Sequence, residues 1–159
     1  IKIIQDVIEE LPDTQFLFLG HDNLNGKVQQ IIKDQKLSAN IKYLGFQDNV
    51  GQYLSESSIF VLPSLYGEGC PTSILEAFSY KLPVIAYNID GIPELVSHNV
   101  DGILIESGDE DSFSIAIKNL LLNPIKANEM GIMGHDKVKE NFLLEVMTTK
   151  HNEYFLGLK

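Results

Sequence analysis

The stretch IFVLPSLYGEGCPTSILEAFSYKLPVIAY, residues 59–87, contains two apolar runs separated by a loop and a helical pattern. The runs, at 59–63 and 83–87, are continuous rather than alternating, which is typical of parallel strands buried on both faces. Between them, a loop containing Gly and Pro precedes apolar residues at helical spacing. Strand, helix and strand in this order predict a βαβ unit with parallel strands.

The same alternation extends over the rest of the chain. Three further apolar runs predict strands at 16–20, 41–45 and 102–106. Helical spacing predicts helices at 1–11, 23–37, 50–54, 93–96, 109–121, 124–142 and 144–158. We therefore expect an α/β fold, a Rossmann-like doubly wound parallel sheet flanked by helices, in a single domain that covers residues 1–159.

The composition favours one soluble domain and excludes some partners. The chain has 159 residues, 44% of them hydrophobic, which is enough for one core. Its net charge is −10, and every basic residue is Lys, so we expect neither nucleic acid nor an anionic membrane as a partner. The single Cys70 excludes an internal disulfide and fits a reducing cytoplasm, and the apolar runs are too short to span a membrane.

The candidate site lies in the loop and helix at 66–78. Ligands of open α/β sheets bind at the carboxyl ends of the strands, and this segment follows one of them. Pro71 suits the first position of a helix, and a helical wheel places Thr72, Ser73 and Glu76 opposite the apolar side. A helix N-terminus with unpaired N–H groups, two hydroxyls and a nearby Gly predicts a phosphate-binding site.

Two glutamates extend this prediction to a nucleotide-sugar. Glu76, one turn into the helix, is suited to accept hydrogen bonds from the adjacent hydroxyls of a ribose, and Glu68 from a second sugar beyond the phosphates. The local sequence fits a simpler interpretation equally well. Ser73 and Glu76 have capping-box spacing, so the helix would begin at Ser73 and Glu68 would be an ordinary loop residue.

The other polar residues carry weaker signals. Cys70 has no His partner nearby, which argues against a catalytic thiol, and the four His show no metal-ligand spacing. The segment DGIPE at 90–94 fits a binding loop, but a turn is favoured in which Gly91 supplies a positive φ and Pro93 starts a helix.

The segment PSLYGEGCPTSILEAFSYKLPVIAYNIDGIPELV, residues 63–96, resembles the nucleotide-sugar-binding segment of retaining glycosyltransferases of the GT-B fold. The hallmark of that large family is two glutamates separated by seven residues, and Glu68 and Glu76 meet it. The resemblance covers nearly the whole chain as the C-terminal lobe of such an enzyme. It implies a metal-independent transferase without a cofactor, which moves a hexose with retention from a nucleoside-diphosphate sugar, such as a UDP-sugar, to a saccharide or other hydroxyl acceptor.

The resemblance also implies roles for single residues. Glu68 would contact the transferred sugar and support charge at its reacting carbon, and is the catalytic candidate, while Glu76 would hold the ribose. Gly69 and Cys70 would line the transferred sugar. The N–H groups of Thr72, Ser73 and Ile74, with the two hydroxyls, would face the diphosphate. The candidates for contact with the base are Phe46 and Gln47. The last two lie in the loop GFQD and would contact the base through backbone atoms, although Phe46 fits a packing aromatic equally well.

The chain departs from the family pattern in two ways. The family pairs the diphosphate with an Arg and a Lys before the first helix, and this chain opens in that helix, so we expect a fragment without the central first strand. Its sheet would then close the gap, exchange elements in a swapped oligomer, or be disturbed. Lys81 occupies a position where Gly commonly ends the helix, so we expect a local change in that turn.

Residues 1–159 alone should therefore lack transferase activity. The acceptor, a saccharide or a lipid-linked one, would bind the missing lobe. We expect a cytoplasmic protein, which in its full-length form would be peripheral to the inner membrane face. The alternative is a non-catalytic interaction or nucleotide-binding module that has kept only the fold. A phosphoacceptor domain would need an Asp cluster at the strand ends, and a dinucleotide-dependent oxidoreductase would need the sequence G-x-G-x-x-G, and neither pattern occurs.

Overall fold

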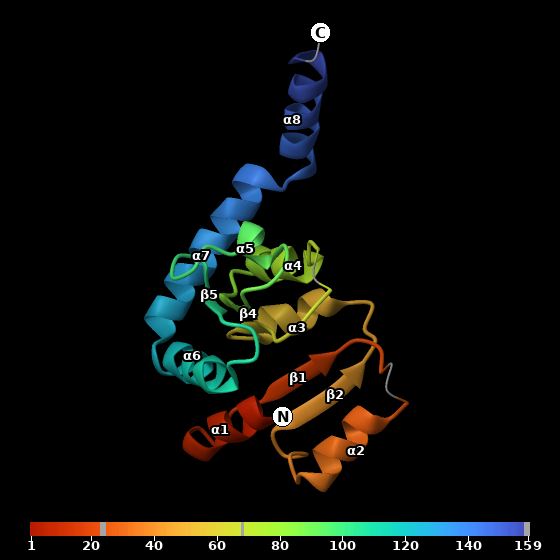
Figure 1. Ribbon diagram of the computed structural model, residues 1–159, viewed down its shortest axis with the longest axis vertical. Coiled ribbons are helices and arrows are strands. Elements are labelled where there is room, and N and C mark those ends of the chain that lie inside the picture. The colour runs from red at the N-terminus through yellow and green to blue at the C-terminus, as the bar shows by residue number, and fades with distance from the viewer. Residues whose placement is uncertain (23–24, 68, 158–159) are drawn as a thin grey trace.

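The computed structural model describes residues 1–22, 25–67 and 69–157. Its elements alternate along the chain, with helices on both sides of parallel strands (Figure 1). The strands are β1 (Phe16–Leu19), β2 (Ile41–Gly45), β3 (Phe60–Leu62), β4 (Val84–Tyr87) and β5 (Gly102–Ile105). The helices are α1 (Lys2–Glu10), α2 (Lys27–Asp34), α3 (Val50–Glu56), α4 (Thr72–Ser79), α5 (Ile92–Leu95), α6 (Glu110–Leu122), α7 (Pro124–Asn141) and α8 (Leu144–Gly157).

The strands form two parallel sheets rather than one. β1 pairs with β2, and β4 lies between β3 and β5 in the second sheet. The predicted α/β fold with parallel strands flanked by helices is confirmed. In the described residues the gap is not closed and the sheet is divided, because β1 and β3 belong to different sheets. Exchange of elements in a swapped oligomer stays a prediction.

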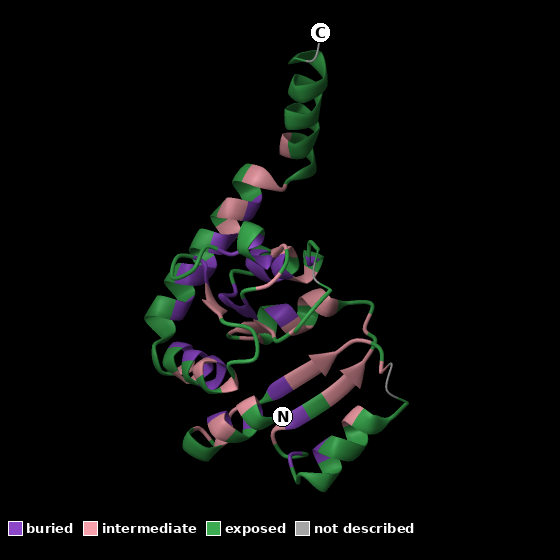
Figure 2. Ribbon diagram, viewed as in Figure 1, coloured by how far each residue is buried: buried purple, intermediate pink, exposed green. Residues whose placement is uncertain are grey.

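Two hydrophobic clusters cover the faces of the second sheet. Successive residues of a strand point to opposite faces, so Ile85 and Tyr87 of β4 enter one cluster while Val84 and Ala86 enter the other. All four are buried, as Figure 2 shows for the centre of the molecule. The first cluster also contains Phe16 of β1, so one core connects the two sheets.

The second cluster is completed by α4 and α7, which pack closely because α7 carries glycines. A Cβ atom at Gly134 would lie 2.2 Å from the ring of Phe78, which is fully buried in α4. A side chain at that position would therefore push the two helices apart. The close packing fixes the position of α4 against α7.

The turn after α4 keeps its usual shape although it contains Lys81. Lys81 N–H donates to Phe78 O at 2.9 Å and Leu82 N–H to Ala77 O at 3.1 Å, a Schellman arrangement that normally has Gly at its left-handed position. The φ of Lys81 is 59°. The expectation of a changed turn is wrong, because these hydrogen bonds and the burial of Leu82 hold Lys81 in the left-handed conformation.

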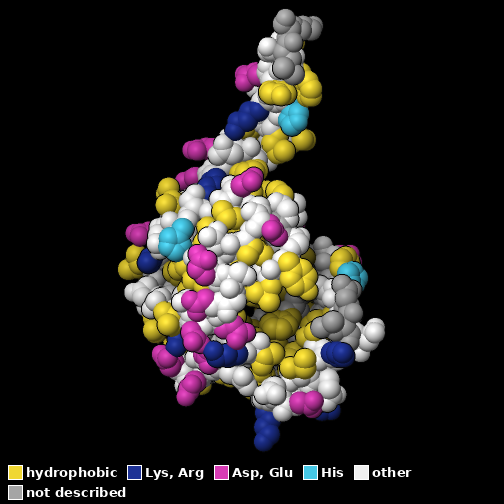
Figure 3. All heavy atoms as spheres, viewed as in Figure 1, with side chains coloured by type: hydrophobic (Ala, Val, Ile, Leu, Met, Phe, Trp, Pro, Cys, Tyr) yellow, Lys and Arg dark blue, Asp and Glu magenta, His cyan; other side chains and the backbone are white. Residues whose placement is uncertain are grey.

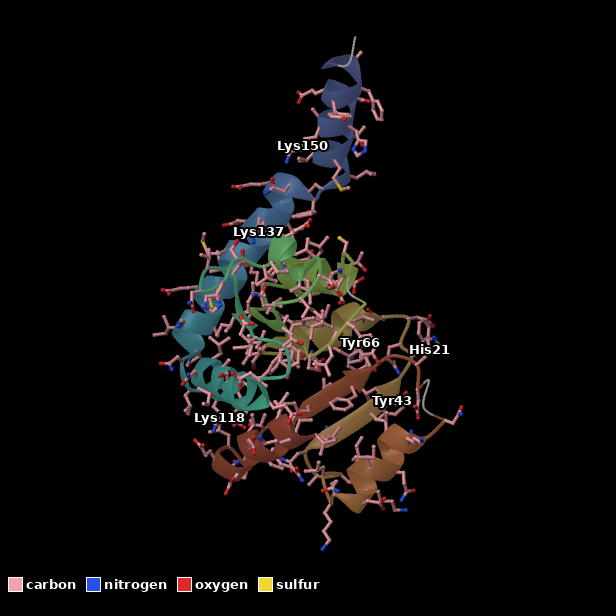
Figure 4. The ribbon with its side chains drawn as sticks, in the orientation of Figure 1. His21, Tyr43, Tyr66, Lys118, Lys137 and Lys150 are labelled. Carbon is pink, nitrogen blue, oxygen red and sulfur yellow. The ribbon has the colours of Figure 1, made fainter. Side chains whose placement is uncertain are left out.

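The loop between α5 and β5 is held to α7 by a buried carboxylate. Asp101 is 1% exposed, accepts a hydrogen bond from Ser97 N–H at 2.8 Å and forms an ion pair with Lys137. Lys137 Nζ also donates to Leu95 O at 2.8 Å. Figure 4 shows Lys137 on α7, next to this loop.

The last helix, α8, extends away from the rest of the molecule (Figure 1). None of its described side chains is buried, and Leu144, Tyr154 and Phe155 are among its exposed apolar residues. Of the helices that the structure describes, none combines the length and the apolar character needed to span a bilayer.

Candidate functional site

The N-terminus of α4 follows the carboxyl end of β3, as the sequence predicts. The helix begins at Thr72, and Pro71 is its N-cap residue with φ of −70° and ψ of 101°. Pro71 was expected as the first helical residue and lies one position earlier. The N-cap residue, Pro71, makes no side-chain capping hydrogen bond, and Ser73 already lies inside the helix, so the capping-box interpretation, with the helix starting at Ser73, is wrong.

The two sides of α4 differ as the helical wheel predicts. Ile74, Ala77 and Phe78 are fully buried and pack on the second sheet. Thr72 and Glu76 are exposed, and Ser73 is half-buried. Ile74 N–H donates to Pro71 O at 3.0 Å, while the amides of Thr72 and Ser73 precede the first intrahelical bond and have no helical acceptor. Two amides and two hydroxyls are therefore available together at this helix end.

Glu68, the predicted catalytic residue, lies outside the described residues. Gly69 and Cys70, which follow it, are exposed and lead directly into Pro71 and α4. Their predicted contact with the transferred sugar stays a prediction.

The loop before α4 is joined to the loop after β4. Gly67 N–H donates to the Asp90 carboxylate at 3.1 Å. The sequence assigned the positive φ of this second loop to Gly91, and that prediction is wrong: Asp90 has φ of 47°, whereas Gly91 has φ of −86° and is the N-cap of α5. Asp tolerates the left-handed region better than most residues, which was the only local signal for this position. Asp90 thus joins the site, and Pro93 lies in the first turn of α5 as expected.

Phe46 and Gln47 lie at the carboxyl end of β2. Phe46 is 59% exposed, so it is not a core aromatic, and its ring stacks on His21 with centroids 4.8 Å apart and planes at 12°. Gln47 Nε2 donates to Leu44 O at 2.7 Å, and its Oε1 accepts from Tyr53 Oη at 3.0 Å. The side chain of Gln47 is therefore engaged within the protein, which leaves its backbone for any ligand.

His21 is a residue that the sequence did not single out. It follows Gly20 at the carboxyl end of β1, and Figure 4 shows it there, with Tyr66 in the loop after β3. Tyr43 Oη donates to Gly20 O at 3.0 Å, and Gly20 N–H donates to Gly45 O at 2.9 Å. These bonds hold the ends of β1 and β2 together and so bring His21 next to Phe46.

Charged groups gather where α1 and α6 begin. Asp109 caps α6 by accepting from Ser112 N–H at 3.0 Å, and this hydrogen bond lowers the pKa of its carboxyl group. Lys2 donates to Asp111, which raises the pKa of the Lys2 ammonium. At the end of β4, burial raises the pKa of the Tyr87 phenol, and nearby carboxylates raise it further. Because Lys2 is paired with Asp111, it does not supply a free cation for a diphosphate.

Among residues 1–22, 25–67 and 69–157, no three His, Cys, Asp or Glu side chains come together as a metal site.

The sequence of residues 1–136 matches the family model described as Glycosyl transferases group 1. The amylovoran biosynthesis glycosyltransferase AmsK of Erwinia amylovora is 31% identical over 135 residues, which cover 80% of this chain and 33% of AmsK. The UDP-Gal:alpha-D-GlcNAc-diphosphoundecaprenol alpha-1,3-galactosyltransferase of Escherichia coli is 40% identical over 108 residues, which cover 67% of this chain and 28% of that enzyme. The chain thus spans only 33% and 28% of the length of these relatives.

Solved structures of glycosyltransferases have the same fold. Sucrose-phosphate synthase from Thermosynechococcus elongatus has a TM-score of 0.85 at 22% identity, over 99% of this chain and 41% of that protein. The Anabaena protein HepE in complex with UDP and glucose has a TM-score of 0.86 at 20% identity, over 96% of this chain and 43% of HepE. The architecture is that of one lobe of a GT-B glycosyltransferase. The family resemblance is confirmed, and the chain belongs to the group 1 glycosyltransferases.

Proposed function

We propose that the full-length protein is a retaining glycosyltransferase, which moves a hexose from a nucleoside-diphosphate sugar to a hydroxyl acceptor, and that residues 1–159 form its donor-binding lobe. One observation carries this proposal. The N-terminus of α4 lies at the carboxyl end of β3, with its apolar side buried and the side bearing Thr72, Ser73 and Glu76 accessible. Among the matched proteins, the Escherichia coli relative is named for UDP-Gal and HepE was solved with UDP, which makes a UDP-sugar the first donor to test.

The diphosphate would be held by the first turn of α4. The amides and hydroxyls of Thr72 and Ser73 supply hydrogen-bond donors, and the helix dipole adds a partial positive charge. The amide of Ile74 is bonded to Pro71 O, so it contributes less. With a net charge of −10 and no Arg, this chain should bind the diphosphate weakly on its own.

The two glutamates would bind the sugars on either side of the diphosphate. The exposed Glu76, on the same side of α4 as Thr72, is placed to accept both ribose hydroxyls. Glu68 would contact the hexose and stabilise the positive charge that develops at its reacting carbon, beside Gly69 and Cys70. A carboxylate near that carbon lowers the barrier by electrostatic stabilisation. We propose that this chemistry needs neither a metal nor a cofactor.

The test is an NMR titration of residues 1–159 with UDP, GDP and ADP at low salt. One diphosphate should shift the amides of Thr72 and Ser73, and Glu76→Ala should weaken its binding about tenfold through loss of the ribose bonds. The matched control is Glu56→Ala, an exposed glutamate at the C-terminal end of α3. Equal affinity of Glu76→Ala and wild type would contradict the role of Glu76.

The full-length enzyme distinguishes a transferase from a module that has kept only the fold. Glu68→Gln and Glu76→Ala should each abolish most of the transfer to an acceptor, and a module would be indifferent to both. Residues 1–159 alone should show no transfer, because the acceptor, a saccharide or a lipid-linked one, would bind the other lobe. Turnover of a nucleotide-sugar by residues 1–159 would overturn this assignment.

Two further expectations concern the surroundings of the enzyme. We propose a cytoplasmic location with peripheral attachment at the inner membrane face, which fractionation of cells expressing the full-length protein would test. Exchange of elements between copies of residues 1–159 also stays a prediction, and sedimentation at two concentrations would reveal such an oligomer.

A further inference from the structure

The loop before α4 is held weakly by its own residues. Leu65, Tyr66, Gly67, Gly69 and Cys70 are all exposed, so burial of side chains does not fix this loop. Between residues that the structure describes, none of these five takes part in a backbone–backbone hydrogen bond outside helices and strands. The conformation of the loop therefore depends on its contacts with neighbouring segments.

The loop after β4, by contrast, is anchored at both ends. Asn88 N–H donates to Ile105 O at 2.7 Å, which ties the start of the loop to the end of β5. At the other end, Ile92 N–H donates to Ile89 O at 3.1 Å, and the side chain of Ile92 is fully buried. Asp90 lies between these two anchors and so belongs to a well-fixed segment.

One hydrogen bond joins the weakly held loop to the anchored one. Leu62 and Ala86 are register partners at the end of the ladder between β3 and β4, so the two loops leave the same edge of the sheet side by side. Gly67 N–H then donates to the Asp90 carboxylate at 3.1 Å. The fixed loop thereby holds the backbone of the exposed one.

Exposed carboxylates are common on this chain, but Asp90 is unlike most of them. The net charge is −10, and Figure 3 shows acidic side chains scattered over one face of the molecule. Asp22 and Asp101 each accept from a backbone N–H only four positions away, whereas the N–H bound by Asp90 is 23 positions away. The bond of Asp90 therefore joins two loops and does not close a turn within one.

The backbone of Asp90 has an unfavourable conformation. Its φ is 47°, in the left-handed region where Gly has no Cβ penalty. Gly91 lies next to it with φ of −86°, so the chain has its Gly beside the strained position and Asp at it. Strained residues that persist at the edge of a site are often retained for function. A Gly at position 90 would lack the carboxylate that binds Gly67.

We propose that Asp90 is a positioning residue for glycosyl transfer, which holds the loop before α4 in place through its hydrogen bond to Gly67 N–H. This role rests on the proposed function, in which Gly69 and Cys70 contact the hexose and Glu68, the residue after Gly67 in the sequence, acts at its reacting carbon. Groups that act in the transition state must be placed accurately.

The nucleoside diphosphate would bind elsewhere, at the N-terminus of α4 and the carboxyl end of β2. Asp90 should therefore affect the rate of transfer and leave nucleotide affinity unchanged.

Asp90→Gly in the full-length protein tests this role. Transfer is measured as release of the nucleoside diphosphate from UDP-galactose, or from the GDP- or ADP-sugar that the titration selects. The kcat should fall about tenfold or more, because the loop loses its link, while the Kd for the nucleoside diphosphate stays unchanged. The midpoint of urea unfolding should stay or rise, because Gly relieves the strain at this φ. A lower rate without lower stability separates positioning from general damage to the fold.

A conservative variant and a control complete the series. In Asp90→Asn the amide oxygen can accept the same hydrogen bond, and Asn tolerates the left-handed region, so kcat should stay within about threefold of wild type. Asn99→Gly is the matched control, because Asn99 is an exposed loop residue with φ of 62°. It should relieve similar strain and leave kcat unchanged.

Hydrogen exchange at Gly67 gives a direct readout of the bond. In residues 1–159, measured by NMR, Asp90→Gly should speed exchange of the Gly67 amide about tenfold, and Asp90→Asn should change it little. The amide of Ile74, which is bonded to Pro71 O, serves as the internal reference. Unchanged exchange at Gly67 in Asp90→Gly would show that the carboxylate does not hold this amide and would overturn the proposal.

The activity measurements have equally definite outcomes. A wild-type kcat in Asp90→Gly, or equal losses in Asp90→Gly and Asp90→Asn, would overturn the positioning role. A parallel loss of nucleotide affinity would make Asp90 a nucleotide ligand and would overturn it as well. Failure of the proposed function is distinguishable, because Glu68→Gln and Glu76→Ala would then leave transfer unchanged. If those two variants abolish transfer and Asp90→Gly does not reduce it, only the role of Asp90 fails.

Discussion

A Cβ atom at Gly131 would lie 1.8 Å from the backbone carbonyl oxygen of Lys81, in the turn that ends α4. That oxygen belongs to the main chain and cannot rotate away, so Gly131→Ala must displace α7 from α4. We expect a loss of about 3 kcal/mol in the free energy of unfolding, measured by urea denaturation. Gly157→Ala is the matched control, because nothing lies within 4 Å of a Cβ there. A loss below about 0.5 kcal/mol for Gly131→Ala would show that the two helices do not pack this closely.

Replacing Lys81 by Gly should stabilise the protein. Its φ of 59° places it in the left-handed region, and Lys36 after α2 has φ of 56° in the same hydrogen-bonding arrangement. Gly adopts this conformation without a Cβ penalty, so Lys81→Gly and Lys36→Gly should each raise the free energy of unfolding by about 1 kcal/mol. Lys139→Gly, the same change within α7, should instead lower it by a similar amount of about 1 kcal/mol. Destabilisation by Lys81→Gly would mean that the lysine side chain contributes more to stability than its left-handed backbone conformation costs.

The ion pair of Asp101 and Lys137 should stabilise the fold because it compensates a buried carboxylate. Lys137→Met keeps most of the apolar stem but leaves Asp101, 1% exposed, without its cation. We expect a loss of about 3 kcal/mol in thermal or urea unfolding, because an uncompensated buried charge is costly. Lys139→Met, on the exposed side of α7, should change stability by less than about 0.5 kcal/mol. Replacing both partners, with Asp101→Asn and Lys137→Met, should recover part of the lost stability. If the double variant recovers none of it, the loss caused by Lys137→Met does not come from the unpaired charge of Asp101.

The order of elements could be predicted because local patterns determine it. The continuous apolar run that became β4 and the helical spacing of Ile74, Ala77 and Phe78 each report burial of a short segment. The N-terminus of α4 and its two distinct sides followed from the same spacing. The division into two sheets depends instead on which strand edges meet, and the sequence left three outcomes open for it.

The parts of the site that were missed depend on contacts between distant segments. Asp90 meets Gly67 across 23 positions in the chain, and His21 meets Phe46 only because β1 and β2 end side by side. Neither contact has a periodic signal in the sequence. The choice of Asp90 over Gly91 for the positive φ likewise follows from the position of the α5 N-cap, which is set by tertiary packing.

The exposed ring of Phe46, stacked on His21, gives the last prediction. If the base of the nucleotide lies at the carboxyl end of β2, the aromatic pair offers it a flat apolar surface, and stacking on one aromatic contributes about 1 to 3 kcal/mol. Phe46→Ala should therefore weaken binding of the preferred nucleoside diphosphate about tenfold or more, measured by the NMR titration. Phe155→Ala, which removes an exposed ring from α8, is the control and should leave the affinity unchanged. The imidazole protons of His21 should shift on addition of the nucleotide. If the amides of Thr72 and Ser73 shift while His21 does not, the diphosphate binds at α4 and the base lies away from this aromatic pair.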